Sequence, residues 1–131
     1  MRIEHFRQRL RANGAKPEHE RRILRAWLSG LALDSGPRRQ PPEQFLPGAV
    51  RADLPQLAAE LAALAGLGSA HPGQDGSERL LVRLADGQSV ESVLLPRDGL
   101  CVSTQVGCAV GCVFCMTGRD GLLRQLGSAE I

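Results

Sequence analysis

The chain has 131 residues, a formal net charge of +2 and 43% hydrophobic residues, but only three Phe, one Trp and no Tyr, so any core must rest on aliphatic side chains. No apolar run approaches the roughly 18 residues of a membrane span, and no apolar stretch follows the basic start as in a secretory signal. We therefore expect a cytoplasmic protein without a membrane partner, in which clustered cysteines serve metal binding or catalysis rather than disulfides.

Two helices are predicted first, over residues 2–12 and from Pro17 to about Leu31, because apolar residues recur there at helical spacing. Asn13-Gly14 and Gly30 are the expected ends. Residues 1–25 hold eight Lys and Arg against three acidic residues. This excess suits an RNA backbone as partner, although a solvated helix face gives the same pattern.

A Pro- and Gly-rich connector over residues 34–48 precedes a third predicted helix. Asp53 has the character of an N-cap, and Pro55 suits the first turn. Leu57, Leu61 and Leu64 form the apolar stripe, and Gly66 with Gly68 is expected to end the helix. These elements make up a predicted helical domain over residues 1–70, followed by a linker over residues 71–79.

The hydrophobic period then changes from 3.6 to 2, which predicts a β-hairpin over residues 80–95 with a turn at Asp86-Gly87. A third strand is predicted at 100–103, and Ser128 is a candidate N-cap for a helix that begins at 129. A strand followed by a helix suggests the first unit of a βα series. The expected fold class is α+β, and we expect residues 80–131 to belong to a longer protein.

Three cysteines, Cys108, Cys112 and Cys115, stand at C-x3-C-x2-C spacing in one glycine-rich segment. Thiolates are the usual ligands of iron–sulfur clusters, and three ligands on a [4Fe–4S] cluster leave one iron open for chemistry. Zinc is an alternative, with Cys101 or a histidine (His5, His19 or His71) as fourth ligand. Disulfides and unrelated core cysteines are further alternatives.

The cysteine spacing, with Phe114 before the last cysteine, resembles the pattern of the radical S-adenosylmethionine (SAM) superfamily. Residues 80–131, and above all VES at 90–92 and CVSTQVGC at 101–108, resemble the RlmN/Cfr family of RNA adenine methyltransferases. The resemblance implies a partial (β/α) barrel, of which residues 80–131 would form the start, and a helical RNA-contacting domain over residues 1–70. It also implies C2 of an adenine in 23S rRNA, and in some transfer RNAs, as the methylated position.

The resemblance further implies roles for individual residues. Cys108, Cys112 and Cys115 match the cluster ligands, and Phe114 would pack beside the cluster and the SAM nucleoside. Cys101 matches a cysteine that helps to resolve a covalent protein–RNA adduct, and Glu91 matches a glutamate near the reacting adenine. The implied cofactors are a [4Fe–4S] cluster and SAM, and the implied partners are RNA and an electron donor such as flavodoxin, for a protein that is monomeric.

The sequence departs from this family in two places. The stretch from Gly121 to Gln125 lacks the aromatic residue and the asparagine that usually follow the cluster, and no cysteine follows Cys115 to accept a methyl group. We therefore expect the 131-residue chain to be inactive by itself. Two other functions remain open: a different radical SAM reaction on RNA, such as C8 methylation, and a non-catalytic RNA-binding module with a remnant metal loop.

Overall fold

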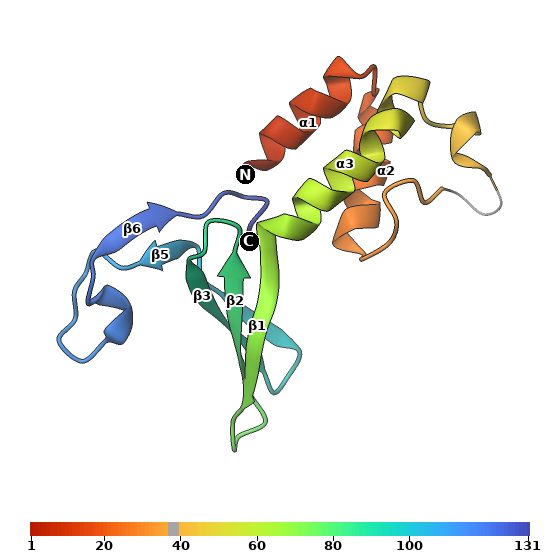
Figure 1. Ribbon diagram of the computed structural model, residues 1–131. Helices are drawn as coiled ribbons and strands as arrows, with labels where there is room; N and C mark the ends of the chain where they lie inside the picture. The colour runs from red at the N-terminus through yellow and green to blue at the C-terminus, as the bar shows by residue number, and fades with distance from the viewer. Residues whose placement is uncertain (37–39) are drawn as a thin grey trace. The chain divides into compact units, whose positions relative to one another are not determined.

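The computed structural model describes residues 1–36 and 40–131, and these divide into two compact units. Residues 2–61 form a helical unit, and residues 62–131, together with Met1, form a β-rich unit. Figure 1 shows the helices and strands of both. No helix in the described part of the chain is both long enough and apolar enough to cross a bilayer.

The helical unit contains α1 (Ile3–Ala12), α2 (Pro17–Leu28), a short 3-10 helix, η1 (Pro42–Gln44), and α3 (Gly48–Leu64), whose last turn enters the β-rich unit. The first two helices confirm the prediction from apolar spacing. Phe6 of α1 stacks on Trp27 of α2, with ring centroids 6.2 Å apart. The buried apolar side chains come from all three helices and their connections: Phe6, Leu10, Ile23, Ala26, Leu33, Leu46, Val50, Leu54, Leu57 and Leu61.

Two details of these helices differ from the expectation. Leu28 and Leu31, expected on the apolar face of the second helix, are 80% and 58% exposed. The third helix begins at Gly48, so Pro55 lies inside it and Asp53 is not its N-cap. The physical reason is that Val50 and Leu54 continue the buried stripe of Leu57 and Leu61 toward the N-terminus, and burial of these side chains outweighs the single backbone hydrogen bond that a proline removes.

The carboxylate of Asp53 has a different task, because it binds Arg9 of α1. Arg9 Nε donates to Asp53 Oδ2 over 2.8 Å, Arg9 Nη1 donates to Glu60 over 2.6 Å, and the Asn13 amide also donates to Asp53. These two carboxylates raise the pKa of Arg9 above its ordinary value. Arg9 therefore joins α1 to α3 by charge-assisted hydrogen bonds.

The β-rich unit has two antiparallel sheets. One has the strand order β1 (Ala65–Pro72), β2 (Glu78–Leu84), β3 (Ser89–Leu95) and β4 (Gly99–Val102), and the other pairs β5 (Gln105–Gly107) with β6 (Leu122–Gln125). The predicted hairpin is confirmed: β2 pairs with β3 across a turn in which Gly87 has a φ of +83°. The third predicted strand is present as β4, antiparallel to β3.

Strand β1 was not expected. Gly66 and Gly68 do not end a helix but lie within a strand, and residues 71–72 of the predicted linker are its last residues. The division between the compact units falls at residues 61 and 62 rather than at 71–79. The register of β1 on β2 shifts between Leu67 and Ser69, and a Cβ at Gly68 would lie 3.2 Å from the carbonyl oxygen of Leu81. A glycine at such an irregularity is typical of a β-bulge.

A small apolar core joins the two sheets. Leu84, Val90 and Val106 are buried together, and Ala65, Val82 and Leu126 pack against them. Residues 128–130, where a helix was expected to begin, form a turn in which the Glu130 N–H donates to Gly127. The structure is thus mixed helix and antiparallel sheet, and the hairpin β5–β6 is fixed to the four-stranded sheet by Val106.

Candidate functional site

The three clustered cysteines lie on the loop that joins β5 to β6, residues 108–121, which we call the cysteine loop. The loop closes at its base because Cys108 N–H donates to the Gly121 carbonyl over 3.1 Å. Inside it, Cys115 N–H donates to the Cys112 carbonyl over 3.0 Å, and a 3-10 turn, η2 (Met116–Gly118), follows. One hairpin therefore carries all three thiols.

All three thiols are free and half-buried. The Thr117 hydroxyl, with the backbone N–H groups of Thr117 and Gly118, holds the pKa of the Cys115 thiol below its ordinary value. The thiolate is the form that binds metals, so this contact favours the ligating form. Among residues 1–36 and 40–131, no three His, Cys, Asp or Glu side chains are grouped as a metal site. Three free thiols on one loop nevertheless fit the donor chemistry of an iron–sulfur cluster.

Glycine is required at the base of the cysteine loop. Gly107 has a φ of +74°, and a Cβ there would overlap the carbonyl oxygen of Gly121, which accepts the hydrogen bond from Cys108. Gly111 also has a positive φ, +64°, but no atom lies within 4 Å of the position that its Cβ would take. The two positions therefore share one backbone requirement and differ in the space around them.

This difference gives a matched pair of variants. Gly111→Ala should lower the free energy of unfolding by about 1 kcal/mol, because the alanine has only to adopt a left-handed backbone conformation. Gly107→Ala should cost about 2 kcal/mol more, because the overlap with Gly121 forces the loop to open. Hydrogen exchange of the Cys108 amide should accelerate about 5-fold in the first variant and more than about 100-fold in the second. Equal exchange rates would contradict this account of the loop.

Phe114, expected beside a cofactor, is 89% exposed, and its neighbour Val113 is fully exposed. Val110 and Met116 are also largely exposed. The cysteine loop therefore presents apolar side chains to its surroundings. The packing of the Phe114 ring beside a cluster and the SAM nucleoside stays a prediction.

Cys101 and Glu91, the two residues predicted to be catalytic, lie on neighbouring strands. Cys101 of β4 pairs with Val93 of β3, and Glu91 lies two residues before Val93, on the same face of the sheet. Such diagonal neighbours are about 7–8 Å apart. The Ser103 hydroxyl donates to the Glu91 carbonyl over 2.6 Å, which ties the residue just after β4 to the middle of β3. The sheet therefore brings these two exposed side chains to one face.

Other residues that shape the site were not identified from the sequence. Arg79 of β2 lies 3.5 Å from the Glu91 carboxylate as an ion pair. Thr117 could have been found from its position two residues after Cys115, within reach of the thiol. Arg124 of β6 gave no such signal, because its carboxylate partner Asp86 is 38 residues away.

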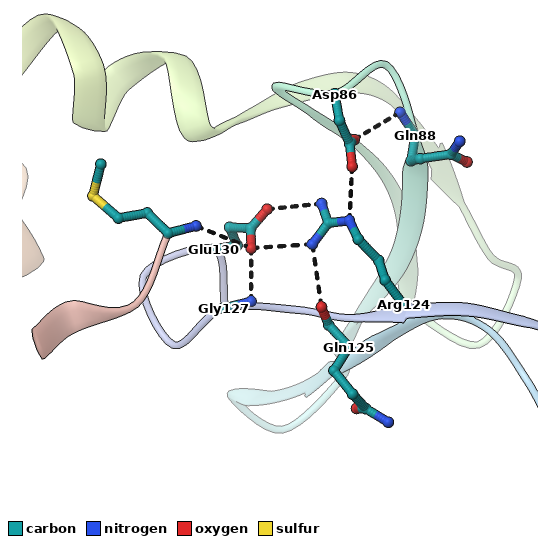
Figure 2. Close-up of polar contacts among 7 residues, drawn as sticks. Asp86, Gln88, Arg124, Gln125, Gly127 and Glu130 are labelled. Carbon is teal, nitrogen blue, oxygen red and sulfur yellow. Dashed lines mark hydrogen bonds and ion pairs between the residues drawn. The ribbon is translucent and has the colours of Figure 1, made fainter. Parts of the chain in front are cut away.

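Arg124 forms a polar network at the base of the hairpin that carries the cysteine loop (Figure 2). Its Nε donates to Asp86 over 2.7 Å, and its Nη2 donates to Glu130 over 2.8 Å. Glu130 also accepts from Gly127 N–H and lies 3.2 Å from the Met1 amino group. Arg124 therefore joins the β2–β3 turn to β6 and to the segment after it.

Known relatives match the chain from end to end. It is 72% identical over all 131 residues to a protein of Aromatoleum aromaticum named "Probable RNA methyltransferase", and 71% identical to one of the same name from Leptothrix cholodnii. The chain spans 36% and 37% of the length of these two relatives. No family model matches the sequence.

A solved structure matches the fold. A radical SAM methyltransferase from Sphaerobacter thermophilus superposes with a TM-score of 0.63 at 30% sequence identity, covering 99% of this chain and 37% of that protein. The two comparisons agree on methyl transfer, one through RNA methyltransferases and the other through a radical SAM methyltransferase. The chain is thus similar over nearly its whole length to both kinds of protein.

Proposed function

We propose that this chain is part of a radical SAM methyltransferase that acts on RNA. The observation that carries the proposal is the cysteine loop, where Cys108, Cys112 and Cys115 are free and lie on one hairpin. The similarity to RNA methyltransferases and to a radical SAM methyltransferase supports it. The finer assignment, methylation at C2 of an adenine in 23S rRNA or transfer RNA, follows from the resemblance of residues 80–131.

In this proposal Cys108, Cys112 and Cys115 hold a [4Fe–4S] cluster. A bound cluster of this kind, reduced by a donor such as flavodoxin, supplies the electron for reductive cleavage of SAM. Thr117 favours the thiolate of Cys115, and Gly107 lets the loop close at its base. The exposed Phe114 would cover the cofactor from the side of the loop, and the protein would act as a monomer.

Cys101 and Glu91 are the proposed residues for the RNA chemistry. They share one face of the sheet, and Glu91 forms an ion pair with Arg79 there. The proposed role of Cys101 is to resolve a covalent adduct between protein and RNA. Glu91 is proposed to contact the adenine base.

The direct test is methyl transfer by the anaerobically reconstituted full-length protein. The reaction contains SAM, a reductant and an rRNA fragment, and the digested nucleosides are identified by mass spectrometry. The expected product is 2-methyladenosine. The isomer 8-methyladenosine would keep the radical SAM assignment and reject the C2 position, whereas no methylated base despite a full cluster would reject the proposed function.

A Cys101→Ser variant separates cofactor binding from RNA chemistry. We expect it to retain the cluster and SAM cleavage, because Cys101 lies outside the cysteine loop, and to lose methylated product by more than about 100-fold, an effect of about 3 kcal/mol on the barrier. Cluster content, 5′-deoxyadenosine formation and methylated RNA are measured side by side. A loss of cluster in this variant would instead make Cys101 a metal ligand.

A further inference from the structure

The basic residues of the helical unit fall into two groups. Arg9 binds Asp53 and Glu60, Arg11 binds Glu20 and Glu4, and Arg51 binds Glu43. In the described residues, Arg21, Arg22 and Arg25 of α2 form no ion pair; Arg21 Nε only donates to the Pro17 carbonyl over 3.4 Å. Five carboxylates of the unit, those of Glu4, Glu20, Glu43, Asp53 and Glu60, thus pair with other arginines. The three arginines of α2 are left without a paired carboxylate among the described residues.

These three arginines share one cavity. A hollow of about 490 Å³ is lined by Arg21, Arg22, Arg25, Glu18, Ser29 and Ser35, among others. Residues 18, 22, 25 and 29 are three or four positions apart, and residue 21 lies beside them, so these residues share one face of α2 and its C-cap. Three arginines against one glutamate leave the hollow with a positive charge, and hydroxyl groups add neutral hydrogen-bonding partners. This combination suits phosphate oxygens, which arginine binds through paired N–H donors.

Arg22 is held in place by an aromatic ring. Its guanidinium carbon lies 4.4 Å from the centroid of the Phe45 ring, a cation–π contact. Its Nη1 is buried and has no hydrogen-bond partner in the described residues. Arg22 also lines a second hollow, of about 440 Å³, whose charged lining is mixed: Lys16, His19, Glu18 and Glu43. A buried donor on an unpaired cation is costly, and a bound anion offsets this cost.

We infer that this hollow on α2, which we call the arginine cavity, binds the phosphodiester backbone of the RNA substrate. The inference rests on the proposed function for the identity of the ligand and adds a contact in the helical unit, separate from the cysteine loop. Guanidinium–phosphate contacts position an RNA without reading its sequence. The arginine cavity therefore contributes affinity, whereas the choice of the adenine lies with other residues.

The test is the salt dependence of RNA binding by the full-length protein, measured as the anisotropy of a fluorescein-labelled RNA stem–loop over a range of KCl concentrations. Affinity falls as salt rises, and each phosphate contact adds about 0.7–0.9 to the steepness of log affinity against log salt. R21A/R22A/R25A should therefore make this dependence less steep by about 2–3. Affinity at low salt should fall at least about tenfold. The double variant R21A/R25A leaves the Arg22–Phe45 stack intact and should lower the slope by about 1.4–1.8.

Two single variants sharpen the result. Glu18→Gln removes the one carboxylate that lines the arginine cavity and should tighten RNA binding about threefold, which a merely structural role does not explain. Arg97→Ala removes the same charge as Arg25→Ala from a turn of the β-rich unit, and should change affinity less than about twofold. Equal effects of Arg97→Ala and Arg25→Ala would overturn the inference.

The ligand and the proposed function are tested separately. A glutamate-rich peptide that displaces the RNA at equal charge concentration would overturn RNA as the ligand. A wild-type protein that assembles a cluster but binds RNA with the same salt slope as R21A/R22A/R25A would overturn the arginine cavity alone. RNA binding through these arginines without any cluster would support the cavity and reject the proposed radical chemistry.

Discussion

Serine in place of Cys108, Cys112 or Cys115 is expected to abolish the iron–sulfur cluster. A cluster held by only three protein thiolates has no spare ligand, and an alkoxide from serine is a poor substitute for a thiolate at iron. After anaerobic reconstitution, iron and sulfide should fall from about four of each per chain to less than about one. The EPR signal of the reduced cluster, and its change on adding SAM, should disappear with them.

Cys101→Ser is the matched control for these three variants, because Cys101 is also a free cysteine but lies in β4 rather than in the cysteine loop. It should keep full iron content and the SAM-dependent EPR change. Tight stoichiometric zinc with no cluster would contradict the assignment. Loss of that zinc in Cys101→Ser would then identify Cys101 as the fourth zinc ligand.

Short-range patterns predicted much of this fold correctly. The Asp86-Gly87 turn was recognised because only a residue with left-handed backbone suits the tight hairpin, and Gly87 has that conformation. Helices α1 and α2 followed from apolar residues three and four positions apart. In each case the residues that define the element lie within one or two turns of each other, so the sequence displays the whole signal.

Elements that depend on distant partners were missed. Strand β1 contains two glycines, and its apolar residues do not alternate; it exists because β2 offers unpaired backbone groups along its edge. The predicted start of α3 is too late, because a proline such as Pro55 is typical of the first turn of a helix. The helix instead follows the burial of Val50 and Leu54, which depends on the packing of the whole unit.

The candidate site divides in the same way. The spacing of Cys108, Cys112 and Cys115 is local and was therefore visible. The shared face of Cys101 and Glu91 required the register of β3 on β4, which the hairpin pattern alone did not fix. The role of Arg124 could not be predicted from the sequence, because only the fold brings the carboxylates of Asp86 and Glu130 to its guanidinium.

Glu130 should make the stability of the β-rich unit depend on pH. Its side chain is 7% exposed, and its hydrogen bond with Arg124, assisted by Gly127 N–H and the Met1 amino group, lowers its pKa to about 2. An unfolded glutamate titrates near pH 4.3. Because the folded pKa is the lower one, the stabilisation is fully present above about pH 4.3 and is lost as the pH falls toward 2.

The difference of a little over two pKa units corresponds to at most about 3 kcal/mol, since Arg124 is partly exposed and water weakens the pair. Glu130→Gln should therefore unfold more easily than the wild type by about 2–3 kcal/mol at pH 7, and the difference should shrink toward zero near pH 2. Unfolding is followed by hydrogen exchange of the β5 and β6 amides at each pH.

Glu4→Gln is the matched control, because Glu4 pairs with Arg11 at 3.6 Å but both side chains are about half exposed. It should change stability by less than about 1 kcal/mol at any pH. A difference in stability between wild type and Glu130→Gln that stays constant from pH 7 to pH 2 would show that the Glu130 charge does not contribute to stability. The expected narrowing would identify the Arg124–Glu130 pair as a contact that stabilises the β5–β6 hairpin, so the same pH range should also loosen the cysteine loop that this hairpin carries.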